Sequence, residues 1–265
     1  MTSVLRIPKA QLALFLFLIF LSTLTHYPVF PSVFILLISL VSTISFDLLF
    51  VSIRKRTVFM PYAAIVTGLI IALLSNPTAG WYEIAAIGAI AMAAKNFIRI
   101  SGRHVFNPAA IGLFIGGILF RQPVAWWGTS FQNITYPTVQ NILTFIILLL
   151  PVIVSGFRLH RHWSMLAFVS AYMIFSYVST TISPSSLAMR LLDPTVVFFA
   201  TVMLPEPMTS PSNPKRQVLF GLTVAVLAQI LSYPSLTNTL IALNLLPDLF
   251  IPALLLGNLL FFKLK

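Results

Sequence analysis

The chain has 265 residues, of which 58% are hydrophobic and only 8% are charged, whereas a soluble domain carries about 25% charged residues. The net charge is +11 and there is no cysteine, which excludes disulfides, thiolate-bound iron–sulfur clusters and cysteine-ligated zinc. Apolar runs on the order of 20 residues recur from end to end, so we expect an all-α polytopic protein in the lipid bilayer. The basic residues punctuate these runs, which argues against nucleic acid as a partner.

Ten apolar runs are expected to form transmembrane helices of a single membrane domain that covers residues 1–265. No small-residue cleavage pattern follows the first run, so it is interpreted as a retained helix and not as a signal peptide. A polar loop at 121–140 separates the two halves, and residues 232–246 are ambiguous. The helices are expected at 10–24, 32–53, 61–75, 81–98 and 108–120 in the first half (1–120), and at 141–156, 163–181, 194–204, 214–231 and 247–262 in the second (141–265).

The charges test this arrangement. If the N-terminus is cytoplasmic, fourteen of the sixteen Lys and Arg residues fall on the cytoplasmic side, and only Arg121 and Arg190 fall outside. We therefore expect a multi-pass protein of the inner (plasma) membrane with both termini in the cytoplasm.

The two halves share a faint internal similarity. Residues 67–80 can be laid over residues 197–210, which superposes Pro77 on Pro207, each at the end of a short helix. The expected topology makes the first of these helices run outward and the second inward, as in an inverted repeat. Short helices of this kind mark binding sites in such folds, although chance similarity between apolar segments is an alternative explanation.

The stretch KNFIRISGRHVFNPAAIGL at 95–113 places cations and a histidine before a helix start. Asn107 is a favourable N-cap and Pro108 suits the first helical position. Such a loop either holds an anion at the helix N-terminus or is an ordinary basic loop at the membrane edge. Together with the start of the helix at 214–231, it predicts a cytoplasmic cationic surface suited to a phosphate-bearing ligand or an acidic protein. This surface collects Lys95, Arg99, Arg103, His104, Asn107, Thr209, Ser210, Asn213, Lys215 and Arg216.

Only five acidic residues are present. Asp47 lies inside an apolar run, where an ionisable group is a functional candidate, unless it reaches water or pairs with Lys55. Glu206 lies between two prolines beside Thr209. The sequence contains no Ser-His-Asp order, metal-ligand cluster, P-loop or dinucleotide-binding glycine pattern, so we assign no catalytic residue and no metal site.

Several blocks resemble one known family. TGLIIAL (67–73), GAIAMAAKNF (88–97) and GRHVFNPAAIG (102–112) are followed by FFATVMLPEPMTSP (198–211), KRQVLFG (215–221) and PDLFIPALLLGN (247–258). In this order they resemble the RnfD/NqrB family, whose members are membrane proteins of the Rnf electron-transport complex and of the sodium-translocating NADH:quinone oxidoreductase. The resemblance covers most of residues 60–262. It implies a urea-transporter-like fold of ten helices in two inverted five-helix repeats, and flavin-based electron transfer coupled to ion movement.

Members of this family usually carry FMN esterified to a threonine in an SGAT-type motif after the fifth helix. That motif is absent here, and the nearest string is WWGTS at 126–130, so covalent attachment to Thr129 is not expected. The resemblance instead implies FMN or riboflavin held without a covalent bond, and Asp47 and Glu206 as candidates for an ion pathway. The candidate flavin-binding residues are Lys95, Arg103, His104, Asn107, Thr209, Ser210 and Lys215.

Three functions remain open from the sequence. The favoured one is a redox subunit, part of an ion-translocating oxidoreductase, that passes electrons between other membrane or soluble redox subunits on the cytoplasmic face. The second is a channel or transporter for a small solute or flavin on the same fold. The third is a structural anchor for a soluble reductase. Fold analogy alone does not choose among them.

Overall fold

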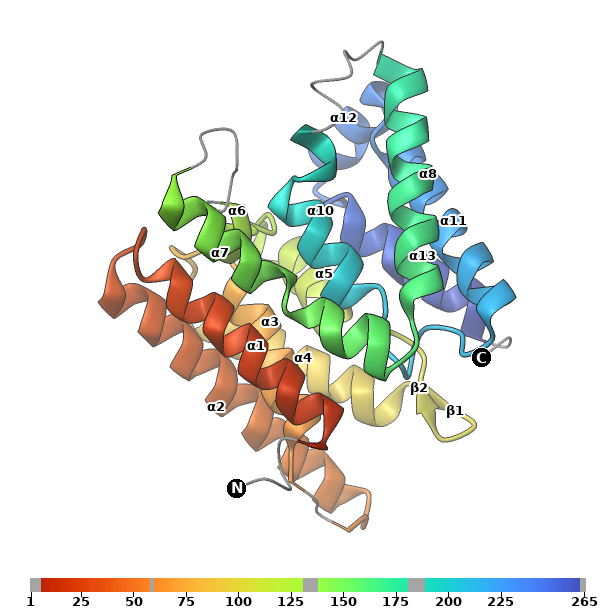
Figure 1. Cartoon of the computed structure of the whole chain (residues 1–265). Helices are drawn as coiled ribbons and strands as arrows, with labels where there is room; N and C mark the ends of the chain where they lie inside the picture. Colours follow the sequence, from red (N-terminus) through yellow and green to blue (C-terminus); the bar gives the residue numbers. More distant parts are fainter. Residues whose placement is uncertain (1–5, 58–59, 131–137, 181–188, 263–265) are drawn as a thin grey trace.

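The computed structural model describes residues 6–57, 60–130, 138–180 and 189–262, and it is mostly helical in these ranges (Figure 1). The first half contains α1 (Pro8–Thr23), α2 (Val29–Ile53), α3 (Tyr62–Leu74), α4 (Trp81–Phe97), β1 (Arg99–Ile100), β2 (Arg103–His104) and α5 (Pro108–Phe120). The remainder contains α6 (Trp127–Ser130), α7 (Val139–Leu149), η2 (Ile153–Arg158), α8 (His162–Thr180), α10 (Pro194–Phe198), η3 (Phe199–Met203), α11 (Pro214–Leu231), α12 (Pro234–Ala242) and α13 (Phe250–Phe261).

In the first half, α2 packs against α3 and α4, and α4 packs in turn against α5. A glycine sets the closest approach of α2 and α4, because a Cβ atom added at Gly88 would lie 2.3 Å from Ser42 Oγ. Small residues at such crossings let membrane helices approach closely where the hydrophobic effect does not drive their association.

In the second half, the main helix contacts join α8, α11 and α13. Helix α11 packs against both α8 and α13, and a Cβ atom added at Gly221 would lie 2.4 Å from the carbonyl oxygen of Ser164. The halves contact each other through α5 and α13, and α1 of the first half also packs against α7 and η2.

The Asn-Pro and Asp-Pro helix starts have the expected chemistry. Helix α5 has the expected bounds, and Asn107 Oδ1 accepts the backbone N–H of Ala110 at 3.2 Å. Asp193 caps α10 and Asn213 caps α11 in the same way, each followed by proline at the first helical position.

Several segments differ from the sequence-based expectation or were left open by it. The helix expected at 141–156 ends at Leu149, because Pro151 cannot continue the hydrogen-bond pattern, and the π-helix η2 follows. The expected loop contains the four-residue helix α6, and the ambiguous segment contains α12. A two-stranded antiparallel hairpin, β1–β2, departs from a purely helical fold.

Within the described ranges, two helical segments are long and apolar enough to cross a membrane by themselves, Val29–Ile53 and Val139–Arg158. A third span is formed if α11 and α12, which are bent by 74° at their junction, are taken as one. The other apolar helices have 10–17 residues, which is short for a full crossing of about 20 residues. The chain is a helical integral membrane protein, and ten crossings remain a prediction.

The basic residues gather at one end of the molecule. Figure 1 shows the β1–β2 hairpin at the lower end of the view and α12 at the upper end. Around the hairpin, Arg99 lies within electrostatic range of Arg54, and Arg161 lies within range of Arg103. A guanidinium nitrogen of Arg158 also donates to the carbonyl oxygen of Arg6 at 3.2 Å. We call this end the cationic end. Lys263 and Lys265, expected on the same side, lie outside the described residues.

Candidate functional site: a central cavity between the two halves

A cavity of about 360 Å³ opens where the two halves meet near the cationic end. The start of α1, helix α3 and the end of α4 form one side of it, and η2 with the turn after η3 forms the other. Both π-helices contribute wall residues, and π-helices occur frequently at functional sites. We call it the central cavity. Its walls include Lys9, Leu12, Thr67, Ile70, Lys95, His104, Asn107, Ser155, Val202 and Glu206.

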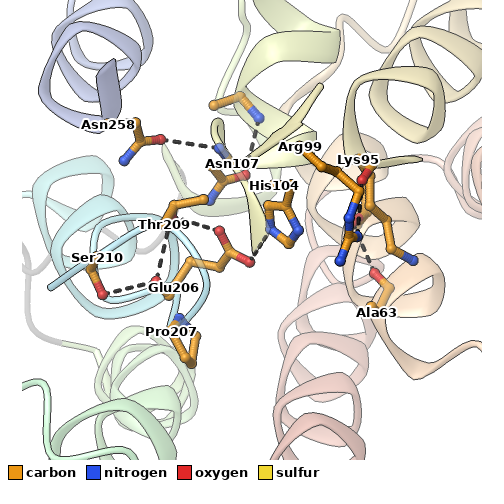
Figure 2. Close-up of polar contacts among 12 residues, drawn as sticks. Ala63, Lys95, Arg99, His104, Asn107, Glu206, Pro207, Thr209, Ser210 and Asn258 are labelled. Carbon is orange, nitrogen blue, oxygen red and sulfur yellow. Dashed lines mark hydrogen bonds and ion pairs between the residues drawn. The ribbon is translucent and has the colours of Figure 1, made fainter. Parts of the chain in front are cut away.

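The central polar contact of the cavity joins His104 and Glu206. The imidazole Nε2 lies 2.8 Å from Glu206 Oε1, and Thr209 donates its hydroxyl to Glu206 Oε2 at 2.6 Å (Figure 2). Ser210 donates its hydroxyl to the Glu206 carbonyl oxygen at 2.8 Å. Burial alone would raise the pKa of Glu206, but the contacts with His104 and Thr209 outweigh it and lower the pKa. The contacts with His104 and Thr209 thus favour the ionised form of the Glu206 carboxyl group.

Asn107 connects three elements beside the cavity. Its backbone N–H donates to Asn258 Oδ1 at 3.0 Å (Figure 2). Its Oδ1 atom caps α5, and its Nδ2 atom donates to the Met203 carbonyl oxygen at 3.1 Å. Its side chain is 2% exposed. The polar atoms of Asn107 thus hold α5 against η3 and α13. At the cavity wall, Asn107 contributes its position and not a free polar group.

Asp47 and Lys95 form an ion pair between α2 and α4. Lys95 Nζ donates to Asp47 Oδ2 at 2.7 Å, and Asn96 Nδ2 donates to Asp47 Oδ1 at 2.9 Å. The two charged side chains are only 7% and 14% exposed, for Asp47 and Lys95 respectively. Asp47 is therefore satisfied by Lys95 and not by Lys55, and Lys95 brings this pair to the wall of the central cavity.

Arg161 was not among the sequence-based candidates. The structure buries it, and its guanidinium donates to the carbonyl oxygens of Pro207, at 3.3 Å, and Pro211. Burial, together with the nearby charge of Arg103, lowers the pKa of Arg161. Arg161 thus holds the turn that carries Glu206. The only sequence feature that pointed to a buried donor was the proline-rich turn, because its carbonyl groups need hydrogen-bond donors.

The remaining candidates lie elsewhere. Arg103 is exposed on β2, and Lys215 is exposed in the first turn of α11, so neither lines the cavity. Thr129 is fully buried in α6, and its hydroxyl donates to the Trp126 carbonyl oxygen at 3.1 Å. No cluster of three or more potential metal ligands exists among the described residues.

The fold and cavity define a helical integral membrane protein with a ligand-sized space between its halves. A family model described as the NQR2, RnfD, RnfE family matches residues 7–145, more than half of the chain. The chain belongs to this family of membrane subunits of Rnf- and Nqr-type complexes. The match includes α1 to α5 and ends within α7, so Glu206 lies beyond it. No individual curated protein matches the chain.

Proposed function

We propose that the chain is a redox subunit of an Rnf- or Nqr-type electron-transport system and binds one FMN or riboflavin non-covalently in the central cavity. The observation that carries the proposal is the cavity itself. Its volume of about 360 Å³ falls within the range of about 300–1,000 Å³ typical of small-molecule sites. Its walls are mainly apolar with a few polar groups, as such sites require.

The wall chemistry fits a flat ring system with polar carbonyl groups along one edge. Leu12, Ile70 and Val202 offer apolar surface for the ring faces, and Lys9 and Lys95 offer positive charge. A positive charge beside a flavin favours the electron-rich edge of the ring, and a phosphate if the ligand is FMN. When bound, the flavin supplies the electron transfer, and the chain positions it and excludes water. Arg103 and Lys215, exposed at the cationic end, then belong to a surface for acidic redox partners and not to the flavin site.

The proposed architecture is two inverted five-helix repeats with ten crossings, each half forming one repeat. Gly88 and Gly221 support this architecture, since each lies seven residues after the first residue of its helix. Gly88 of α4 lies where α4 crosses α2, and Gly221 of α11 lies where α11 crosses α8. The polar pair Lys95–Asp47 joins α4 to α2, and Gln229, whose Nε2 atom donates to Ser176 Oγ at 2.9 Å, joins α11 to α8. Helix α4 ends and α11 begins at the cationic end, so the paired helices run in opposite directions. Both chain ends would then face the cytoplasm of the inner membrane.

Asp47 and Glu206 are proposed as stations of an ion pathway that borders the flavin. Glu206 lines the cavity, and Asp47 reaches it through Lys95. A change in flavin charge next to Lys95 would change the strength of the ion pair between Lys95 and Asp47. This offers a physical link between electron transfer and ion movement.

The test is flavin binding to purified protein in mild detergent, measured by quenching of riboflavin and FMN fluorescence. Lys9→Gln removes an exposed charge at the cavity, and Lys215→Gln removes a matched charge away from it. We expect Lys9→Gln to weaken FMN binding more than Lys215→Gln does. If neither flavin binds and liposomes containing the protein instead conduct a small solute, the transporter function replaces the redox function.

A further inference from the structure

Two further cavities lie at the end of the molecule opposite the cationic end, and no residue of the proposed flavin site lines them. Helix α8 begins beside Arg161 at the cationic end and runs for 19 residues, or about 28 Å at 1.5 Å per residue. Helix α11 begins at the same end, runs beside α8, and bends by 74° into α12 (Figure 1). The two further cavities lie around the end of α8 and this bend.

The larger cavity, about 960 Å³, has a mixed polar and apolar lining and carries charges of both signs. Arg190 and Asp193 line it together with Tyr172, Ser232 and Ser235. Arg190 and Asp193 do not form an ion pair, and Arg190 donates no side-chain hydrogen bond to any residue that the structure describes. Asp193 uses Oδ1 to cap Thr195 at 2.8 Å, which leaves Oδ2 for another donor. We call this the Arg190 cavity.

The smaller cavity, about 480 Å³, is an apolar groove between α8 and the α11–α12 bend. Phe175, Val178, Val226 and Ile230 form most of its walls. Gln229 and Tyr233 line both cavities, so the groove and the Arg190 cavity are adjacent. An apolar groove that adjoins a polar, charged cavity suits a ligand with a polar head and a hydrocarbon chain.

We propose that these two cavities form one site for a membrane phospholipid with a zwitterionic, primary-amine headgroup. The guanidinium of Arg190 binds the phosphate, because its planar donors match phosphate oxygens. Asp193 accepts hydrogen bonds from the ammonium group, and an acyl chain occupies the groove. The presence of Asp193 disfavours a headgroup of net negative charge, since like charges at close range repel.

This lipid site also gives a function to Arg190, whose position does not follow the expected placement of basic residues on the cytoplasmic side. Arg190 is one of the two cations that fall outside the cytoplasmic majority. A lipid bound there would sit at the level of the outer headgroups if the expected topology holds. The inference does not depend on the proposed redox function, because no residue of the central cavity takes part.

The test is lipid retention by the purified, delipidated full chain, read by native mass spectrometry. Phosphatidylethanolamine, phosphatidylcholine and phosphatidylglycerol with the same acyl chains are added in turn. We expect the wild-type protein to retain phosphatidylethanolamine about threefold better than the other two lipids, because phosphatidylcholine has no N–H group to donate to Asp193 and phosphatidylglycerol brings a net negative charge close to it. Equal retention of all three lipids would overturn the proposal.

Two variants separate the two charges. Arg190→Gln should lower the affinity for all phospholipids about tenfold, as expected for one charge-assisted phosphate contact. Asp193→Asn keeps a good N-cap and should remove only the preference for the primary amine. Arg121→Gln, the other outlying cation, is the matched control and should change neither property. Equal effects of Arg190→Gln and Arg121→Gln would contradict a phosphate site at Arg190.

A third variant tests the groove. Val226→Trp fills the apolar groove from a partly exposed position, so it should lower lipid retention while the thermal stability stays near that of the wild type. If glycerophosphoethanolamine, which lacks acyl chains, displaces the lipid at equal concentration, the site binds a free phosphate headgroup and not a lipid.

Discussion

His104 and Glu206 are 102 residues apart in sequence, and their side chains meet at 2.8 Å between β2 and the turn after η3. The contact joins the family-matched segment to the part of the chain beyond the match. It also places the carboxyl group of Glu206 and the imidazole of His104 at the wall of a cavity between the two halves.

A double-mutant cycle on His104 and Glu206 should show strong coupling. Each single variant, His104→Gln or Glu206→Gln, leaves the other partner without its contact, and the double variant removes both. We expect a coupling free energy of about 1–2 kcal/mol, because Glu206 is partly exposed and charge-assisted hydrogen bonds contribute about 1.5–3 kcal/mol when fully buried. Unfolding titrations in mixed micelles measure it. Additive single effects would contradict the structural coupling.

Lys95 and Asp47 should behave as a buried ion pair. Lys95→Met leaves the Asp47 charge without a cation and should cost about 3–5 kcal/mol of unfolding free energy. The double variant Asp47→Leu/Lys95→Met removes both charges and should be more stable than the single variant. The same mixed-micelle titration compares them. A double variant less stable than Lys95→Met would show that the two charges do not stabilise each other.

Asn107→Ala should be more destabilising than an ordinary loss of a helix cap. Asn213→Ala is the matched control, since Asn213 caps α11 at an exposed position and should cost about 0.5–2 kcal/mol. Asn107→Ala loses its cap and also the donor to Met203, so we expect an additional cost of about 1–3 kcal/mol. Equal melting temperatures of the two variants would mean that the contact between α5 and η3 is not important.

The expected topology is testable because the chain has no cysteine, so a single introduced thiol is labelled without background. Ser212 before α11 and Asn238 in α12 are both exposed. In intact cells, a membrane-impermeant maleimide should label Asn238→Cys directly and Ser212→Cys only after lysis. The reverse pattern would invert the topology, and labelling of both from outside would contradict the crossing by α11.

Features that local chemistry determines were predictable from the sequence. Asn107-Pro108 predicted the start of α5, because capping and the fixed φ of proline act within one turn. The basic residues predicted a common end, and His104, Asn107, Lys95 and Glu206 do line one cavity.

Features that depend on packing were not predictable from the sequence. The partner of Asp47 is 48 residues away and is determined by how α2 crosses α4, so Lys55 was an equally reasonable sequence-based candidate. Arg161 was missed because burial of a cation depends on carbonyl groups brought from another segment. The π-helices η2 and η3 have no simple sequence pattern that distinguishes them from α-helix.

The most direct test of the central claim is the flavin content of the purified wild-type protein, from its visible absorbance and from the flavin released by acid. The redox proposal predicts a yellow protein with about one flavin per chain, all of it released by acid because none is covalently bound. A colourless protein that neither retains flavin nor takes it up when FMN or riboflavin is added would contradict the proposal.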